Sequence, residues 1–141
     1  MAALSEQIRR NQLAIISLLI AFMALGYNTW RNELTEKNRN IREAGFEMLV
    51  HVAELQRITY LAHYDKDLVE GNPRKGWSEV LILKDLAQLM PYSAHPGTAT
   101  LADTWEQNWQ GLGQQDESVA RIDTALDGLR TDILEALAEL D

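Results

Sequence analysis

The 141-residue sequence has no cysteine, three prolines and eight glycines. Without cysteine the chain has no disulfides, no thiolate-bound zinc or iron–sulfur cluster and no cysteine nucleophile. So few glycines and prolines are untypical of loop-rich or collagen-like chains. Hydrophobic residues make up 46% of the sequence, which is untypical of disordered chains. Basic residues are also scarce, at 13 against 21 acidic residues. A net charge of −8 repels phosphate backbones, so we expect no nucleic-acid partner.

Sequence motifs of common enzyme classes are missing as well. The chain lacks a Gly-x-Ser-x-Gly elbow, a phosphate-binding glycine loop and a His-Glu-x-x-His helix. None of its three histidines has an obvious serine or aspartate partner by spacing. These absences predict a non-catalytic protein without a cofactor.

The apolar residues concentrate near the N-terminus, in the run LAIISLLIAFMALGY at 13–27. From Leu13 to Trp30 the segment has 18 residues, about 27 Å of helix, close to the roughly 30 Å of a hydrocarbon core. Arginines precede the segment and aromatic residues end it, which is typical of side chains at a membrane interface. The pattern predicts a short tail over 1–12 and a transmembrane anchor over 13–30, with the lipid bilayer as a partner.

Two alternatives stay open for this segment. A cleaved signal peptide would use Leu13–Met23 as its apolar core and Ala24-Leu25-Gly26 as its cleavage residues, and a soluble protein would bury the segment as a core helix. We prefer the anchor because the helical pattern continues past Trp30 without a breaker. A count of positive charges alone slightly favours a cytoplasmic C-terminal domain, but a short tail beside Arg9 and Arg10 is easily retained. We therefore favour the N-terminus inside and the C-terminal domain on the extracytoplasmic side.

The remaining residues, 31–141, carry 11 basic and 20 acidic side chains and indicate an acidic helical domain. No segment alternates as a strand does, and we expect four helices at approximately 31–64, 77–90, 100–111 and 116–140. Four amphipathic helices bury their apolar stripes by packing together. The predicted fold is therefore all-α, with a transmembrane helix that continues into an antiparallel four-helix-bundle-like domain.

Two of these helices show a coiled-coil-like repeat of apolar residues. The repeat comprises Leu34, Ile41, Met48, Leu55 and Ala62 in the first helix and Val119, Ile122, Leu126, Leu129, Ile133, Ala136 and Leu140 in the last. This spacing predicts that both stripes are buried. The helix at 77–90 is nearly all apolar, and we expect it to be the most buried element.

Turn and capping residues predict the helix ends. Gly71-Asn72-Pro73 places a loop over 65–76. Thr100, with Asp103 three residues later, is expected to cap the third helix, and Asp116 is expected to cap the fourth.

Glu47, His51 and Glu54 lie on one helical face and are candidates for a metal or proton-transfer site, because two carboxylates and an imidazole suit a divalent cation. Di-iron bundles use Glu-x-x-His on two helices, whereas this chain has His-x-x-Glu, and the three predicted helices that follow contain no histidine. We therefore prefer a polar seam residue flanked by solvated glutamates and expect no bound metal.

A second acidic stretch contains His63, Asp65, Asp67 and Glu70. It does not match an EF-hand, because Gly71 falls at position 7 instead of 6 and Gly76 stands where a glutamate is required. We interpret the stretch as a solvated transition from helix to loop.

Two further sets of residues are candidates for a ligand or partner surface. Arg74 and Lys75, beside Trp77, suit an anionic ligand, an acidic partner or lipid headgroups, although a soluble turn also explains them. Trp105 and Trp109 lie one helical turn apart and suit a ligand groove or a partner surface, although core packing is the commoner role for this spacing.

These patterns favour a small single-pass membrane protein whose acidic bundle is a non-catalytic interaction or scaffold module. We expect an accessory component of a membrane complex that binds a protein partner or copies of itself. In architecture alone, the span followed by a bundle resembles the input modules of chemoreceptors and sensor kinases. That resemblance implies the alternative of a ligand-sensing domain with a separate signalling partner. A metal-dependent enzyme using Glu47, His51 and Glu54 is the third and least favoured hypothesis.

Overall fold

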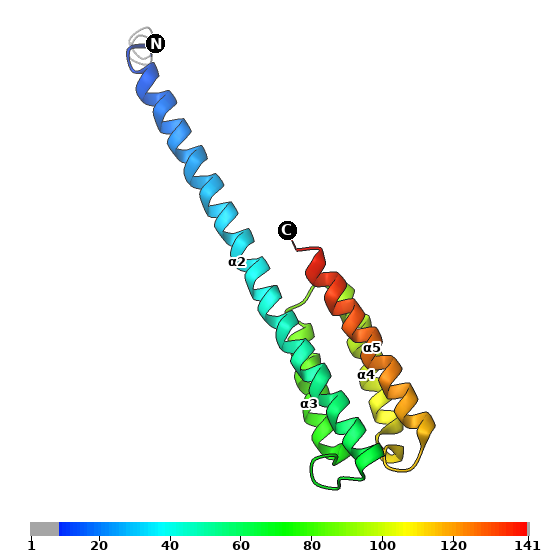
Figure 1. The fold of residues 1–141 in the computed structure, drawn as a ribbon. Coiled ribbons are helices and arrows are strands. Elements are labelled where there is room, and N and C mark those ends of the chain that lie inside the picture. Colours follow the sequence, from blue (N-terminus) through cyan, green and yellow to red (C-terminus); the bar gives the residue numbers. More distant parts are fainter. Residues whose placement is uncertain (1–8, 141) are drawn as a thin grey trace. The chain divides into compact units, whose positions relative to one another are not determined.

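The computed structural model describes residues 9–140, and within this range every regular element is a helix (Figure 1). The α-helices are α2 (Gln12–Tyr60), α3 (Pro73–Ala87), α4 (His95–Asn108) and α5 (Asp116–Ala138). A π-helical turn, η1 (Leu61–Asp65), follows α2, and the 3-10 turns η2 (Tyr92–Ala94) and η3 (Trp109–Gly111) flank α4. The all-α prediction is confirmed for these residues, whereas most of the predicted tail, residues 1–8, lies outside them.

The chain divides into two compact units, Met1–Lys37 and Asn38–Asp141, and α2 contributes residues to both. The boundary lies beyond Trp30, where the sequence predicted the anchor to end. In the first unit every described side chain is exposed, and none of the most apolar part of α2 is buried. A buried core helix therefore does not explain the apolar segment. By length and composition the segment is able to cross a membrane.

The second unit begins where the apolar repeat of α2 becomes buried. Ile41, Met48, Leu55 and Ala62 are all buried, as their seven-residue spacing predicts. Leu34 is 47% exposed, because it belongs to the first unit and meets no core. The buried stripe therefore starts one heptad later than predicted, at Ile41.

Helix α3 begins at Pro73, not at the predicted Trp77. The Asn72 side chain caps the helix by accepting a hydrogen bond from the Arg74 backbone N–H at 3.0 Å. Proline suits the first helical position, where its missing N–H has no partner to lose. The Asn-Pro pair starts the helix, so the predicted loop over 65–76 is too long.

The predicted caps of the last two helices are wrong. Helix α4 begins at His95 with Pro96 in its first turn, so Thr100 lies inside the helix. Gln115 occupies the cap position of α5, and Asp116 is its first helical residue. Asp116 still favours this helix end, because a carboxylate interacts favourably with the N-terminal helix dipole.

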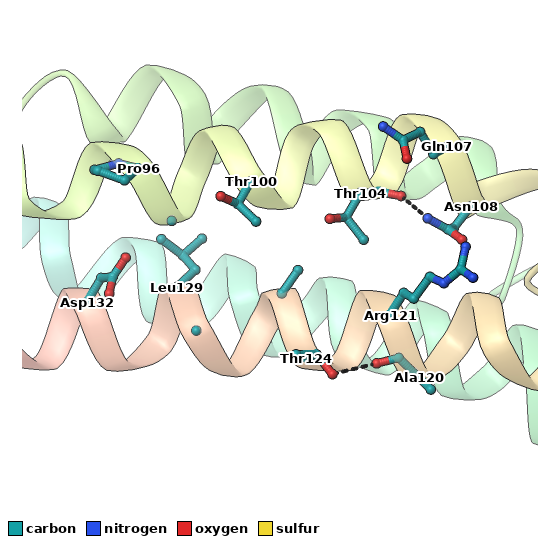
Figure 2. Close-up of a pocket in the computed structure, with 13 residues that line it drawn as sticks. Pro96, Thr100, Thr104, Gln107, Asn108, Ala120, Arg121, Thr124, Leu129 and Asp132 are labelled. Atoms are coloured by element: carbon teal, nitrogen blue, oxygen red, sulfur yellow. Dashed lines mark hydrogen bonds between the residues drawn. The ribbon is translucent and has the colours of Figure 1, made fainter.

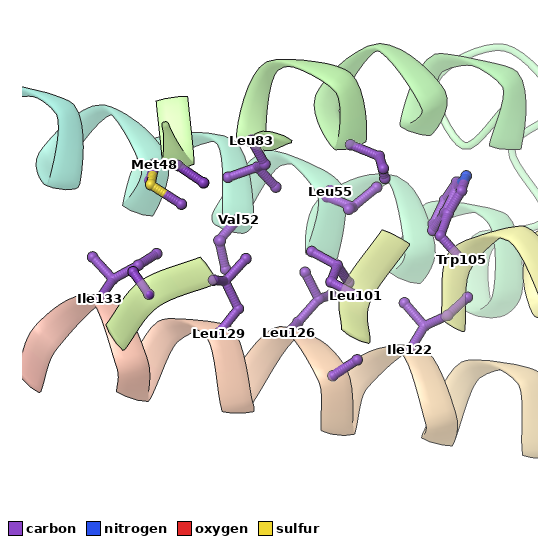
Figure 3. Close-up of a cluster of buried hydrophobic side chains, with 14 of the residues drawn as sticks. Met48, Val52, Leu55, Leu83, Leu101, Trp105, Ile122, Leu126, Leu129 and Ile133 are labelled. Atoms are coloured by element: carbon purple, nitrogen blue, oxygen red, sulfur yellow. The ribbon is translucent and has the colours of Figure 1, made fainter. Parts of the chain in front are cut away.

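One hydrophobic core joins all four helices of the second unit (Figure 3). Its largest side chains include Met48, Val52 and Leu55 of α2, Leu83 of α3, Leu101 and Trp105 of α4, and Ile122, Leu126, Leu129 and Ile133 of α5. The predicted stripe of α5 is buried from Val119 to Ala136. Helix α3 is not the most buried element, because it buries a single face and leaves Leu81 and Ile82 exposed.

Two glycines allow close approach around the start of α3. A Cβ at Gly71 would lie 2.7 Å from the Asp67 carbonyl oxygen and would overlap the backbone of η1, so only glycine lets the loop fold onto η1. A Cβ at Gly76 would overlap the indole of Trp105, which packs directly on the α3 backbone. The unpredicted first turn of α3 is therefore part of the packed core.

Candidate functional site

His51 links α2 to α3 by a hydrogen bond that the sequence did not predict. Its Nδ1 lies 2.6 Å from Oε2 of Glu79, and its Nε2 lies 3.4 Å from Oε1 of Glu47. A carboxylate oxygen only accepts, so the bond to Glu79 requires a proton on Nδ1, which donates it. Both His51 and Glu79 are largely buried, whereas Glu47 is mostly exposed. This arrangement supports a polar bridge between the two helices.

Glu54, the third residue of the predicted cluster, points to a different partner. Its two carboxylate oxygens accept hydrogen bonds from Nε and Nη2 of Arg57, at 2.8 and 2.7 Å. These bonds hold the pKa of Glu54 below its usual range. The structure therefore brings Glu47 and His51 together, whereas Glu54 is paired with Arg57. In residues 9–140, no three His, Asp or Glu side chains form a group suited to a metal ion.

The acidic stretch and the basic pair of the sequence form one surface network. Glu70 accepts from Nζ of Lys75 at 2.7 Å and from Arg57 at 3.4 Å, and these two cations lower its pKa. The Asp67 carboxylate accepts from the backbone N–H groups of Glu70 and Val69, which lower its pKa. Lys75, in the first turn of α3, is thus engaged with the preceding loop, whereas the side chain of its neighbour Arg74 is exposed. The network fastens the loop between η1 and α3 to the end of α2.

His63 fastens η1 to the start of α5. Its Nδ1 lies 3.0 Å from the Leu112 carbonyl oxygen and its Nε2 lies 3.2 Å from Oδ1 of Asp116. A carbonyl oxygen only accepts, so this bond requires the proton on Nδ1. Two turns into α5, burial raises the pKa of Asp123, and the nearby Asp127 raises it further. Oδ1 of Asp123 is buried and has no hydrogen-bond partner among the described residues.

The three tryptophans of the second unit gather near the start of α3. Trp105 is fully buried, which supports core packing over a ligand groove for this residue. Trp77 and Trp109 are half-buried and pack edge to face, with ring centroids 6.4 Å apart. The indole N–H of Trp105 lacks a hydrogen-bond partner among the described residues. Its burial therefore costs desolvation free energy, which the close packing of the ring offsets.

A groove between α4 and α5 was not predicted from the sequence (Figure 2). Its volume is about 600 Å³, and it is lined mainly by small and threonine side chains. Thr100 and Thr104 line one wall, and Arg121 and Asp132 stand toward opposite ends of the other wall. Small residues at every fourth position of α5, at Ala120, Thr124 and Gly128, were the sequence signal for this groove.

Exposed large apolar side chains of the helices in the second unit concentrate on α2 and α3. Phe46 and Val50 of α2 are 60% and 61% exposed, and Leu81 and Ile82 of α3 are exposed as well. Among the described residues, α4 has no such side chain and α5 has only Leu134. Ala53, one turn after Val50 on the same face of α2, is exposed too. We call Phe46, Val50 and Ala53 the outer α2 stripe.

A shallow groove of about 460 Å³ runs between α2 and α3 beside this stripe. Its α2 wall contains Glu43 and Glu47, and its other wall contains Leu86 of α3 and Leu89, which follows that helix. An acidic edge therefore borders the outer α2 stripe on the side of α3.

Comparison with known proteins does not assign a function to any of these surfaces. No protein family, curated protein or solved structure matches this chain at a significant level.

Proposed function

We propose that this chain is a single-pass membrane protein in which residues 13–30 anchor an antiparallel four-helix bundle that serves as a non-catalytic interaction module. The observation that carries the proposal is the apolar segment of α2, whose side chains are all exposed. Exposed apolar side chains over the length of a hydrocarbon core are favourable in lipid and costly in water. Helix α2 continues without interruption past Gly26, which supports an anchor over a cleaved signal peptide.

The shared core and the surface of the second unit support the role of an interaction module. Its four helices bury their stripes in one core, and ion pairs such as His51–Glu79 and Lys75–Glu70 join one helix or loop to another. Such a unit is suited to present a rigid surface to an accessory partner in a membrane complex. We place this unit on the extracytoplasmic side, and reporters fused after Asp141 test that orientation by their activity on one side only.

In-cell crosslinking of the full-length chain tests the interaction role. We expect wild-type protein to give a discrete crosslinked adduct, and the variant carrying Leu126→Asp and Leu129→Asp to lose it, because buried carboxylates disrupt the core. Leu134→Asp is the matched control, since Leu134 lies on the same helix and is half exposed. Absence of an adduct from wild-type protein, or its persistence in the double variant, contradicts the proposal.

The groove between α4 and α5 favours a second candidate function, that of a ligand-sensing domain. Its volume of about 600 Å³ lies in the range of small-molecule sites, and threonines and one charge of each sign line it. Screening of small molecules by thermal shift on the full-length chain tests this candidate. A ligand should raise Tm of the wild type, and Thr124→Trp, which fills the groove, should abolish the shift. No shift with any compound would argue for the interaction role alone.

A further inference from the structure

We propose that the outer α2 stripe is the contact between two copies of this chain, which meet in parallel through Phe46, Val50 and Ala53. The inference rests on the proposed membrane anchor, because copies anchored through the same end of the chain present α2 in the same direction. It goes beyond the interaction role by naming the partner as a second copy and the contact as one face of one helix.

The spacing of the stripe is the first argument. Phe46, Val50, Ala53, Arg57 and Tyr60 follow one another at alternating intervals of four and three, the spacing of a coiled-coil seam. All five are exposed, whereas the core of the unit takes the opposite face of the same helix through Met48, Val52 and Leu55. Helix α2 thus carries two seams, one filled by the protein's own core and one unfilled. An exposed apolar seam of this kind is typical of a protein contact.

The charges at the edges of the stripe identify the occupant as a second copy. Arg42 borders one edge and Glu47 borders the other, and both are exposed. Nη2 of Arg42 donates to the Leu140 carbonyl oxygen of its own chain at 2.7 Å, which leaves the other guanidinium nitrogens for a partner. In a parallel two-stranded pair, a residue on one edge meets the residue five positions later on the other edge of its partner. Arg42 of each copy would therefore face Glu47 of the other, which gives two opposite-charge pairs related by the two-fold axis. Glu47 is suited to this pairing because its side chain is mostly exposed and its contact with His51 is long, at 3.4 Å.

The one basic residue in the seam is already neutralised. Arg57 is held by Glu54 and Glu70, which lie toward the side of α3. Its charge is thus paired within its own chain before two copies meet. A short seam is sufficient here, because confinement of both copies to one membrane raises their effective concentration.

Disulfide crosslinking of the full-length chain in membranes tests the inference, and the absence of native cysteine removes any background. Ala53→Cys and Ala99→Cys form a matched pair, since both alanines are exposed on helices and only Ala53 lies in the stripe. Under mild oxidation we expect a covalent dimer from Ala53→Cys and Val50→Cys and little from Ala99→Cys, because a disulfide requires Cβ atoms about 4 Å apart. Equal crosslinking at Ala99 and Ala53, or none at the stripe, would overturn the inference.

A charge exchange tests the pairing at the edges of the stripe. Arg42→Glu in the Ala53→Cys background should weaken dimer formation about two- to fivefold, as expected for an exposed ion pair. Adding Glu47→Arg should restore it, whereas no recovery would contradict the assigned pairing. Alkaline extraction of the same samples separates the two proposals. A chain that stays in the membrane without crosslinking refutes only the dimer, and a chain released from the membrane refutes the anchor.

Discussion

Two glycines of this protein illustrate how the same substitution has opposite effects at two residues. Gly76 lies in α3 with the Trp105 indole on its backbone, whereas Gly128 lies on an exposed face of α5 with no atom within 4 Å of an added Cβ. Alanine favours a helix interior over glycine in both places. Only at Gly76 does the surrounding core oppose the extra methyl group.

We expect Gly76→Ala to destabilise the fold by about 1–3 kcal/mol, because the buried indole has to move. Gly128→Ala should stabilise it by about 0.5–1 kcal/mol through helix propensity alone. Urea denaturation of both variants in detergent measures the two free energies of unfolding. Stabilisation by both substitutions would mean that Trp105 does not pack on Gly76.

The partly buried carboxyl group of Asp123 should make the free energy of unfolding depend on pH. Its raised pKa means that the folded chain holds this proton more tightly than the unfolded chain. The destabilisation of the fold by the ionised carboxylate is therefore absent below the unfolded pKa of about 3.9 and fully present above the raised pKa. Asp123→Asn should increase the free energy of unfolding at neutral pH and leave it unchanged near pH 3. Asp85→Asn, at an exposed position of α3, controls for the loss of one negative charge, and an equal gain there would contradict the burial effect.

At the scale of elements, each helix of the second unit is held by a buried stripe and ended by local chemistry. Leu126 and Leu129 lie fully buried at the centre of the α5 stripe, and Asn72 caps α3. These two kinds of contribution differ in size, because a buried leucine loses both its transfer free energy and its packing when truncated. They are therefore separable by mutation.

Leu126→Ala should lower the free energy of unfolding by about 2–5 kcal/mol, as expected for a fully buried leucine. Leu134→Ala on the same helix should cost less than about 1 kcal/mol, because Leu134 is half exposed and alanine is a good helix former. Thermal unfolding followed by circular dichroism compares the two variants. Similar losses would contradict the assignment of the α5 stripe.

The cap of α3 gives a further contrast. Asn72→Ala should cost about 1 kcal/mol, because it removes the side chain that accepts from the Arg74 N–H. Thr100→Ala should be neutral within about 0.5 kcal/mol, since Thr100 lies inside α4 and caps nothing. Urea titration measures both losses of unfolding free energy. A larger loss from Thr100→Ala than from Asn72→Ala would contradict the helix starts in the structure and favour those predicted from the sequence.

The sequence was sufficient for the stripes but not for the helix starts or the cross-helix contacts. The positions of Met48, Leu55 and Leu126 follow from periodicity, which depends on one helix at a time. The starts at Pro73 and His95 were missed because proline marks a turn and a first helical position equally well. The bond between His51 and Glu79 depends on the register of α2 against α3, which no spacing within one helix encodes. The groove between α4 and α5 depends on such a register as well.

At the scale of the whole molecule, the composition averages two different units. The first unit exposes an apolar helix, and the second closes a core beneath an acidic surface. Lipid around the first unit, and thus the proposed anchor at residues 13–30, is the central claim. Two arginines near the middle of that segment should prevent insertion, at a cost of about 2.5–3.5 kcal/mol each.

Alkaline extraction of membranes that contain the full-length chain tests this claim most directly. The wild type should stay in the membrane pellet at full-length mass, and Leu19→Arg with Phe22→Arg should move the chain to the supernatant. Leu81→Arg with Phe46→Arg is the matched control, because it adds the same charges at exposed positions of the second unit and should leave the chain in the pellet. Release of the wild type, or recovery of a chain shortened within its first 30 residues, would contradict the account.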